Sequence, residues 1–212
     1  MINNSKLNIT VLCEGDEEEA YFNSLLNLNI FNSKYVFKLR NVGGAYNLPS
    51  FYEAEYAKEE VDAILMLFDV DNPSHETFNY VTKHLMDDYG INIDDVLSFS
   101  IFTNPCTMQL YLWHFKDINL KTSNKKELSE ELKKVYPRLL AQKSYNAHQY
   151  QLRYLMGYID GNSYSNLKNI LKNKSTNYLY NPSTNMLKFL DYFENDNEKF
   201  IKEININIDR NI

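Results

Sequence analysis

The chain has 212 residues, of which 44% are hydrophobic and 24% are charged; these proportions exclude an intrinsically disordered chain and favour one sizeable hydrophobic core. The formal net charge of −6 would argue against a nucleic-acid partner if it were evenly spread. It is not, because residues 1–115 carry a net charge of −11, residues 116–180 carry +7 and residues 181–212 carry −2.

The start of the chain gives no targeting or membrane-spanning signal. MINNSKLNIT lacks the positive-then-apolar pattern of a signal peptide. The longest apolar run, residues 63–68, is far shorter than the ~20 residues that span a bilayer. Cys13 and Cys106 fit no C-x-x-C spacing, so we expect both to be buried thiols in a reducing compartment. Together these features predict a cytoplasmic protein with no membrane partner.

Strands and helices are expected to alternate from the first apolar run onward. LNITVLC, residues 7–13, is β-branched and apolar, and a helical pattern over residues 16–28 follows it after Glu14-Gly15. A second strand is expected at residues 35–42, and a helix at residues 48–58. The next run, AILMLFDVD, has no polar alternation until its end, which predicts a central strand buried on both faces.

Two further elements follow this central strand. Ser74 is expected to cap a helix that ends before Gly90. Residues 96–102 are expected to form another strand, which ends at Asn104-Pro105. Strands that alternate with helices predict an α/β fold with a parallel sheet, and active groups at the carboxyl ends of its strands.

Strand signals disappear after Phe115. Four later stretches have helical spacing of apolar residues: KKELSEELKKVYPRLLAQ, AHQYQLRYLMGYI, YSNLKNILKN and TNMLKFLDYFEN. Glycine and proline are scarce, so no flexible linker is expected. We therefore predict that residues 1–115 form an α/β core and that residues 116–212 form a helical C-terminal part packed on it.

Acidic residues stand at the ends of two of the predicted strands. Glu14 ends the first strand, and Asp69 and Asp71 end the central one. Alternate side chains of a strand share a face, so Asp69 and Asp71 are expected to point at the same space. Glu18, in the helix that follows the first strand, can approach this space. Crowded carboxylates repel one another unless a divalent cation neutralises them, and oxygen ligands favour Mg²⁺ or Mn²⁺. We predict that these four residues bind metal and are catalytic.

Structural roles explain each of these carboxylates when it is taken singly. Aspartate at a strand end often forms a turn. Acidic residues in a first helical turn are favoured by the helix dipole, and this effect alone accounts for the neighbouring Asp16, Glu17 and Glu19. The combination of strand-Glu-Gly-helix with strand-D-x-D favours the metal site. That combination resembles the TOPRIM domain shared by topoisomerases, primases and overcoming-lysogenization-type nucleases.

Three stretches narrow this resemblance. CEGDEEEAYF, residues 13–22, looks like an E-G-x-x-E-x-x-Y-F motif. FTNPCTMQLYLWHF, residues 102–115, is similar to S-N-P-C-F-E-x-W-L-L-L-H-F, and YNPSTNMLKFL, residues 180–190, to N-P-x-T-x-V-x-x-L. The three motifs, in this order, resemble those of RloB-like proteins, TOPRIM proteins of bacterial restriction and abortive-infection loci. This chain has Thr107-Met108 where the family motif has F-E, so the resemblance implies a weaker or lost metal site if that carboxylate is a ligand.

The resemblance implies a metal-dependent nuclease of bacterial anti-phage defence. It also implies an ATPase partner of the AAA or ABC-like kind, since RloB-like proteins are commonly encoded beside one and this chain has no G-x-x-x-x-G-K-[ST] loop. Three alternatives stay open: a non-catalytic binding module, a nucleotidyl transferase or primase-like enzyme, and a phosphatase of small molecules. The sequence decides neither between DNA and RNA nor the oligomeric state.

The basic segment offers contacts to a nucleic-acid backbone. Tyr150, Tyr154 and Tyr158 recur every fourth residue, a spacing that favours a buried helix face over base stacking. The candidate phosphate contacts are Lys125, Lys126, Lys133, Lys134, Arg138 and Lys143.

Three further residues are possible accessory groups. Asn104 could orient a phosphate or a metal-bound water, and Lys83 could stabilise developing charge. His114 matches the histidine of the family motif. Structural roles are nevertheless favoured: a turn for Asn104, a solvated helix face for Lys83 and packing for His114. No zinc spacing such as H-E-x-x-H is present.

Overall fold

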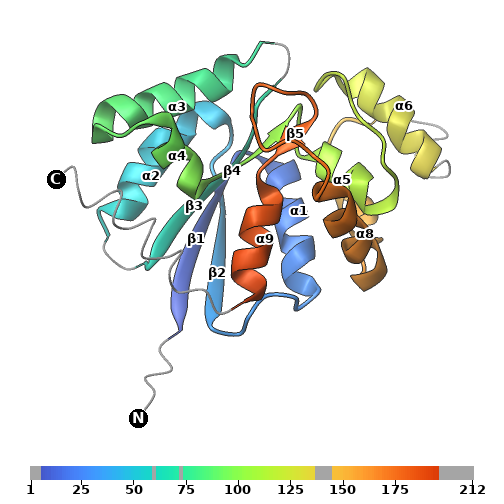
Figure 1. The fold of residues 1–212 in the computed structure, drawn as a ribbon, viewed down its shortest axis with the longest axis horizontal. Coiled ribbons are helices and arrows are strands. Elements are labelled where there is room, and N and C mark those ends of the chain that lie inside the picture. The colour runs from blue at the N-terminus through green and yellow to red at the C-terminus, as the bar shows by residue number, and fades with distance from the viewer. Residues whose placement is uncertain (1–5, 59–60, 72–73, 137–144, 196–212) are drawn as a thin grey trace.

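The structure, a computed structural model, describes residues 6–58, 61–71, 74–136 and 145–195. It has a mixed α/β fold around a five-stranded sheet with the strand order β2-β1-β3-β4-β5 (Figure 1). The first four strands run parallel, and β5 runs antiparallel to β4. The predicted α/β fold is confirmed, and the sheet, which was predicted as parallel, is mostly parallel.

The central strand is the most deeply buried. All seven residues of β3 are buried, as expected of an apolar run without alternation. Val11 of β1 pairs with Leu39 on one side and Leu65 on the other, which fixes the register of the three strands. The strands are β1 (Leu7–Cys13), β2 (Tyr35–Asn41), β3 (Ala63–Asp69), β4 (Ser100–Asn104) and β5 (Ser183–Thr184).

Helices cover both faces of the sheet. The helices α2, α3 and α4 lie on one face, and α1 and α9 lie on the other (Figure 1). On the second face Phe22 of α1, Phe37 of β2 and Phe193 of α9 form an aromatic cluster. The helices are α1 (Asp16–Asn27), α2 (Leu48–Tyr56), α3 (Glu76–Tyr89), α4 (Ile93–Phe99), α5 (Met108–Phe115), α6 (Lys125–Val135), α7 (Gln149–Met156), α8 (Gly161–Leu171) and α9 (Met186–Glu194), with a short 3-10 turn, η1 (Ala45–Asn47).

The strand predicted at residues 96–102 is partly a helix. Residues 96–99 belong to α4, and β4 begins only at Ser100. The side chain of Asn92 accepts hydrogen bonds from the backbone N–H groups of Asp94 (2.8 Å) and Asp95 (3.1 Å), which caps α4. The prediction was wrong because a short apolar run does not distinguish a strand from a buried helix.

The start of α3 also differs from the prediction. Ser74 does not cap the helix; its hydroxyl donates to the backbone carbonyl of Asp71 (3.3 Å). His75 holds the capping position with a φ of 52°. The predicted stop is confirmed, since Gly90 ends α3 in the left-handed conformation that glycine adopts without strain.

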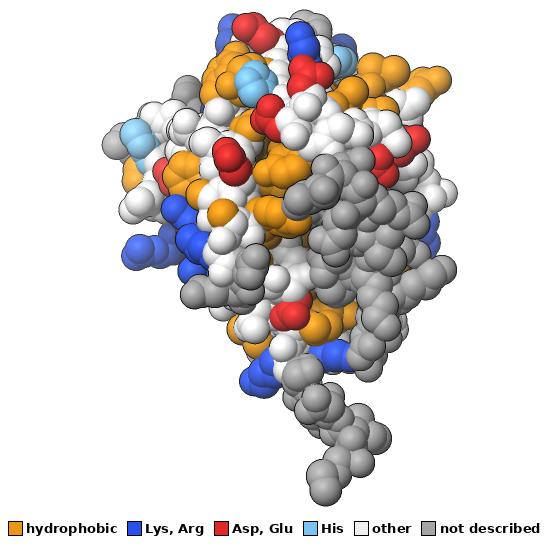
Figure 2. Space-filling model, turned by 90° about the vertical axis from the view of Figure 1, so that its left-hand side faces the viewer, with side chains coloured by type: hydrophobic (Ala, Val, Ile, Leu, Met, Phe, Trp, Pro, Cys, Tyr) orange, Lys and Arg blue, Asp and Glu red, His pale blue; other side chains and the backbone are white. Residues whose placement is uncertain are grey.

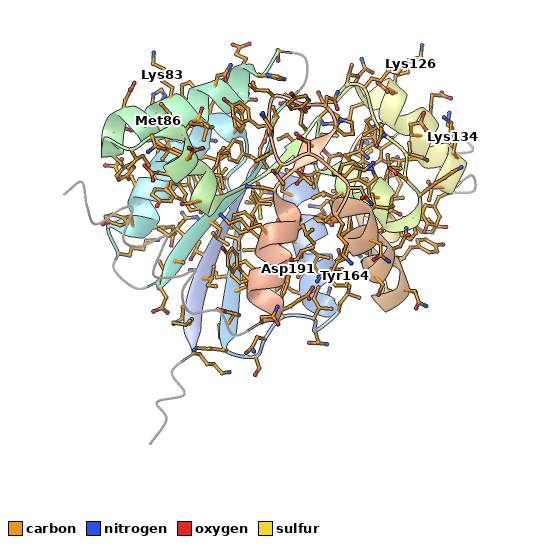
Figure 3. The ribbon with its side chains drawn as sticks, in the orientation of Figure 1. Lys83, Met86, Lys126, Lys134, Tyr164 and Asp191 are labelled. Carbon is orange, nitrogen blue, oxygen red and sulfur yellow. The ribbon has the colours of Figure 1, made fainter. Side chains whose placement is uncertain are left out.

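The helices after α5 pack against the first half of the chain. Asn166 of α8 donates to the backbone carbonyl of His114 (3.0 Å). Lys168 joins α8 to α9 through Asp191 (2.9 Å) and Glu194 (2.7 Å), close to the labelled Tyr164 (Figure 3). β5, which the sequence analysis did not predict, adds a two-residue strand to the sheet. Within the described ranges, no helix is long and apolar enough to cross a membrane.

Candidate functional site

Two of the candidate carboxylates meet where neighbouring strands end. Glu14 follows β1 directly, and Asp69 is the last residue of β3. An oxygen of Glu14, Oε2, accepts a hydrogen bond from the backbone N–H of Asp69 (3.0 Å). Because β1 and β3 are adjacent and parallel, their carboxyl ends bring residues 55 positions apart into contact.

Glu18 reaches the same place from the first turn of α1. One of its oxygens, Oε2, accepts a hydrogen bond from the backbone N–H of Gly15 (2.9 Å), which closes the start of the helix. The residue is only 4% exposed, and its other oxygen, Oε1, is buried with no hydrogen-bond partner among the described residues. A buried carboxylate oxygen without a partner is costly, so a proton or a cation is needed there.

Asp69 is held from the opposite side by Thr107. Its Oδ1 accepts a hydrogen bond from the backbone N–H of Thr107 (2.7 Å) and a second from the Thr107 hydroxyl (2.9 Å). Thr107 stands directly before α5, and the sequence analysis did not include it among the site residues. The only sequence feature that could have indicated this role of Thr107 is its position directly after the N-P-C segment.

Asp71 does not lie on the strand. β3 ends at Asp69, and Asp71 adopts a left-handed conformation with a φ of 55°. The argument that alternate strand residues share a face was therefore wrong for this pair. The Asp71 carboxylate accepts a hydrogen bond from the hydroxyl of Thr77 in α3 (3.2 Å). Its charge nevertheless contributes to the raised pKa values of Glu14 and Asp69, which places it close to both.

Burial and mutual repulsion keep protons on these groups. Burial, the larger cause, and the negative charges of neighbouring carboxylates together raise the pKa of Glu14 to about 7 and the pKa of Glu18 to about 8. Burial likewise raises the pKa of Asp69 well above its usual range, with Glu18 and Glu14 as the next causes. Without a cation, the three carboxyl groups therefore retain protons near neutral pH.

A lysine and a tyrosine from the second half of the chain join this cluster through Glu17. Lys125, the first residue of α6, forms an ion pair with Glu17 (Nζ to Oε2, 2.7 Å). The hydroxyl of Tyr145 donates to the other oxygen of Glu17, and Lys125 lies 5.5 Å from the centre of the Tyr145 ring. The sequence analysis explained Glu17 by the helix dipole and Lys125 as a backbone contact, and it missed Tyr145.

The oxygen atoms of these carboxylate side chains are of the type that binds a hard divalent cation. The side chains are not arranged around a common point as they stand. Among the described residues, no three His, Cys, Asp or Glu side chains form a group that could hold a metal ion as they stand. Glu14 and Glu18 each give an oxygen to a backbone N–H. Every donor is an oxygen, as Mg²⁺ and Mn²⁺ prefer, and no described residue donates a hydrogen bond to Glu18 Oε1.

The other candidate lysines of α6 are paired with glutamates or point into solvent. Lys133 pairs with Glu130 (3.6 Å), and Lys134 pairs with Glu131 (2.6 Å). Lys126 and Lys134 project from α6 into solvent (Figure 3). Arg138 and Lys143 lie outside the described residues.

Lys83 lies on the other side of the molecule. It projects outward from α3, across the molecule from Lys126 of α6 (Figure 3). The flank that contains α3 carries acidic and basic side chains in small groups rather than one basic face (Figure 2). This position agrees with the solvated helix face that the sequence favoured for Lys83.

Asn104 and His114 hold the fold together. Asn104 is fully buried, and its amide donates to the backbone carbonyl of Tyr178 (2.9 Å). His114 is 1% exposed, and its Nε2 lies 3.1 Å from the hydroxyl of Tyr21. Burial lowers the pKa of His114 to about 3, so it is neutral. The contact of His114 agrees with the packing role that the sequence favoured, whereas Asn104 joins β4 to a distant segment instead of forming a turn with its side chain.

The tyrosine stripe differs from its prediction. Tyr150, Tyr154 and Tyr158 are 53%, 38% and 43% exposed, so the interpretation of this stripe as a buried face was wrong. The buried face of α7 is formed by Leu152 and Leu155 instead.

Comparison with known proteins assigns the family. A family model described as RloB-like protein matches residues 9–193, which run from within β1 to within α9. The chain therefore belongs to the RloB-like family. No curated protein and no solved structure matches it.

Proposed function

We propose that this RloB-like protein is a TOPRIM-type nuclease that depends on Mg²⁺ or Mn²⁺ to cleave phosphodiester bonds. The observation that carries this proposal is the grouping of the buried Glu18 and Asp69 with the half-buried Glu14 where β1 and β3 end and α1 begins. Grouping three such acids raises the free energy of the folded protein at neutral pH unless a cation compensates them. A divalent cation explains why the sequence keeps them there.

The residues divide into ligands and supporting groups. Glu14 and Asp69 would hold one ion, and Glu18 and Asp71 would help to hold a second or orient water. A bound ion would supply electrostatic stabilisation of in-line attack at a phosphodiester and a lower pKa for the attacking water. Thr107 fixes the orientation of Asp69, and Lys125 provides a positive charge beside the acidic cluster for a phosphate.

The wider context is part of the same proposal. A sheet with four parallel strands, two of which (β1 and β3) end at acidic residues, supports the resemblance to TOPRIM domains. Membership of the RloB-like family supports a role in bacterial anti-phage defence beside an AAA or ABC-like ATPase, with DNA or RNA as the substrate.

Cleavage assays test the proposal directly. Purified protein is incubated with supercoiled plasmid, single-stranded DNA and total tRNA in Mg²⁺, Mn²⁺ or EDTA, beside the variant Asp69→Asn. We expect cleavage that requires metal and is lost in the variant, because Asn keeps the Thr107 hydrogen bonds but not the charge. Equal cleavage by the variant, or cleavage in EDTA, would contradict the proposed chemistry.

One observation favours a second candidate, a non-catalytic module that binds nucleic acid or a partner. Met108 occupies the acidic position of the family motif and is fully buried. The neighbouring Gln109 does not replace that carboxylate, since its amide bonds the backbone of Ile118 and Leu120 at 2.6 Å each. Binding of nucleic acid without any cleavage in Mg²⁺ or Mn²⁺ would favour this candidate.

A further inference from the structure

The solvent-facing side of α7 and the turn that follows it are unusually aromatic. Tyr150, Tyr154 and Tyr158 expose between 38% and 53% of their surface. Their neighbours extend the patch: the ring of His148 stacks on Tyr150 with centroids 5.8 Å apart, and Tyr136 lies 4.5 Å from Tyr158. We call these five residues the α7 aromatic patch. Exposed aromatic groups gathered in this way mark interaction sites.

The rings of this patch are inclined to one another. Tyr154 and Tyr158 have centroids 5.0 Å apart and planes 65° apart, and the hydroxyl of Tyr158 donates to that of Tyr154 (2.7 Å). Two bases stacked on these two rings would therefore not be parallel. A duplex keeps neighbouring bases parallel, whereas a single strand can present them at such an angle.

The charges beside the patch indicate which side a polyanion would follow. Arg153 is exposed and lines a hollow of about 620 Å³ together with Gln149, Tyr150 and Tyr154. A guanidinium beside exposed aromatic rings suits a phosphate next to a stacked base. On the other side of Gln149 and Arg153, a groove of about 810 Å³ contains Asp16 and Glu19, which repel phosphate.

One end of the patch is linked to the acidic cluster through two side-chain contacts. Tyr145, four residues before α7, donates its hydroxyl to Glu17. Asn146, the next residue, lies 2.9 Å from His148 of the patch (Nδ2 to Nε2). A strand that follows α7 toward its N-terminus would therefore approach the acidic cluster from the side of Glu17.

We propose that the α7 aromatic patch binds single-stranded nucleic acid by base stacking and directs it to the acidic cluster. This inference rests on the proposed nuclease function, since it names the substrate class of the same site. Stacking is tolerant of sequence, so the patch selects an unpaired strand rather than a particular base order.

Binding is measured separately from cleavage. Fluorescence anisotropy in EDTA follows the binding of labelled single-stranded DNA, single-stranded RNA and duplex DNA of equal length. The comparison of the two single strands shows whether the patch prefers DNA or RNA. The test variant is the triple Tyr150→Ala, Tyr154→Ala, Tyr158→Ala, and the triple Tyr→Phe variant keeps the rings. Tyr46→Ala is the matched control, because Tyr46 is 50% exposed and contacts a tyrosine of α3 instead.

We expect wild type to bind single strands at least about tenfold more tightly than duplex, and each Tyr→Ala change to weaken binding about fivefold or more. The triple Tyr→Phe variant and Tyr46→Ala should bind like wild type. Circular dichroism melting of the triple Ala variant verifies its fold; if it is unfolded, the single changes carry the test.

Unchanged affinity after Tyr→Ala, or equal affinity for duplex, would overturn the inference even if wild type cleaves nucleic acid. Loss of self-association in the triple Ala variant without any single-strand binding by wild type would overturn it in favour of a protein interface. Tyrosine-dependent binding without metal-dependent cleavage would support the inference and contradict the nuclease proposal.

Discussion

The side chain and the backbone of Thr107 converge on a single oxygen of Asp69. The N–H donates at 2.7 Å and the hydroxyl at 2.9 Å, both to Oδ1. Two donors on one oxygen fix the rotation of the carboxyl group and leave Oδ2 as its remaining ligand atom. The loop before α5 thus sets the geometry of the acidic cluster.

Thr107→Val should lower the free energy of unfolding by about 1–3 kcal/mol, because it removes one buried hydrogen bond without changing the size of the side chain. Urea denaturation in EDTA measures this change. Thr107→Ser keeps the hydroxyl and should stay close to wild type. Equal losses in the two variants would show that the hydroxyl does not stabilise Asp69.

The stability of the metal-free protein should fall as pH rises from about 5 to about 8. The glutamates titrate near 4.5 without burial, but Glu14 has a pKa of about 7 and Glu18 a pKa of about 8 in the folded protein. Between these values the folded state holds protons that the unfolded state has released, so raising the pH favours unfolding.

Urea titrations at several pH values in EDTA measure this slope. Glu18→Gln cannot ionise and keeps an oxygen for the N–H of Gly15, so it should remove part of the fall. Stability that rises across this range in wild type would mean that the acidic cluster is stabilised in its charged form without metal.

Asp69→Asn should raise the melting temperature of the metal-free protein at pH 8. Folding opposes the ionisation of Asp69 beside Glu14 and Glu18, and the neutral Asn removes this cost while it keeps an oxygen for Thr107. Differential scanning calorimetry in EDTA measures the shift. A lower melting temperature would indicate that the charge of Asp69 has a stabilising partner in the fold.

Lys125 and Lys134 form a matched pair for testing the role of the basic segment. Each bonds a glutamate, at 2.7 Å and 2.6 Å, but only Lys125 lies beside the acidic cluster. Lys125→Met should slow metal-dependent cleavage by about tenfold or more, because a cation near the reacting phosphate is lost. Lys134→Met should leave the rate within about twofold in the same assay. Equal effects would show that Lys125 acts only through general charge.

Local sequence patterns predicted the frame of this site. The β-branched run that forms β1 and the apolar run that forms β3 are long enough for their type to be clear, and Glu14 and Asp69 follow from where those strands end. Adjacent parallel strands then bring the two carboxylates together. Asp71 was less predictable, because its left-handed φ of 55° depends on the loop that follows β3.

Contacts between distant segments were beyond such patterns. Thr107 is 38 positions from Asp69, and Tyr145 is 128 positions from Glu17, so only the packing of α5 and α6 brings them together. The exposure of Tyr150 and Tyr154 could have been predicted from the spacing of apolar residues in the same helix. Leu152 and Leu155 already provide a buried stripe on the opposite face of the helix.

The binding of Mn²⁺ to the metal-free protein tests the central claim most directly. Isothermal titration calorimetry at pH 8 compares wild type with Asp69→Asn, and Asp191→Asn controls for the loss of an acidic residue far from the cluster, between α9 and α8. We predict saturable binding by wild type and by Asp191→Asn, and at least about tenfold weaker binding by Asp69→Asn. No binding by wild type, or equal binding by all three proteins, would contradict a metal centre built on Glu14, Glu18 and Asp69.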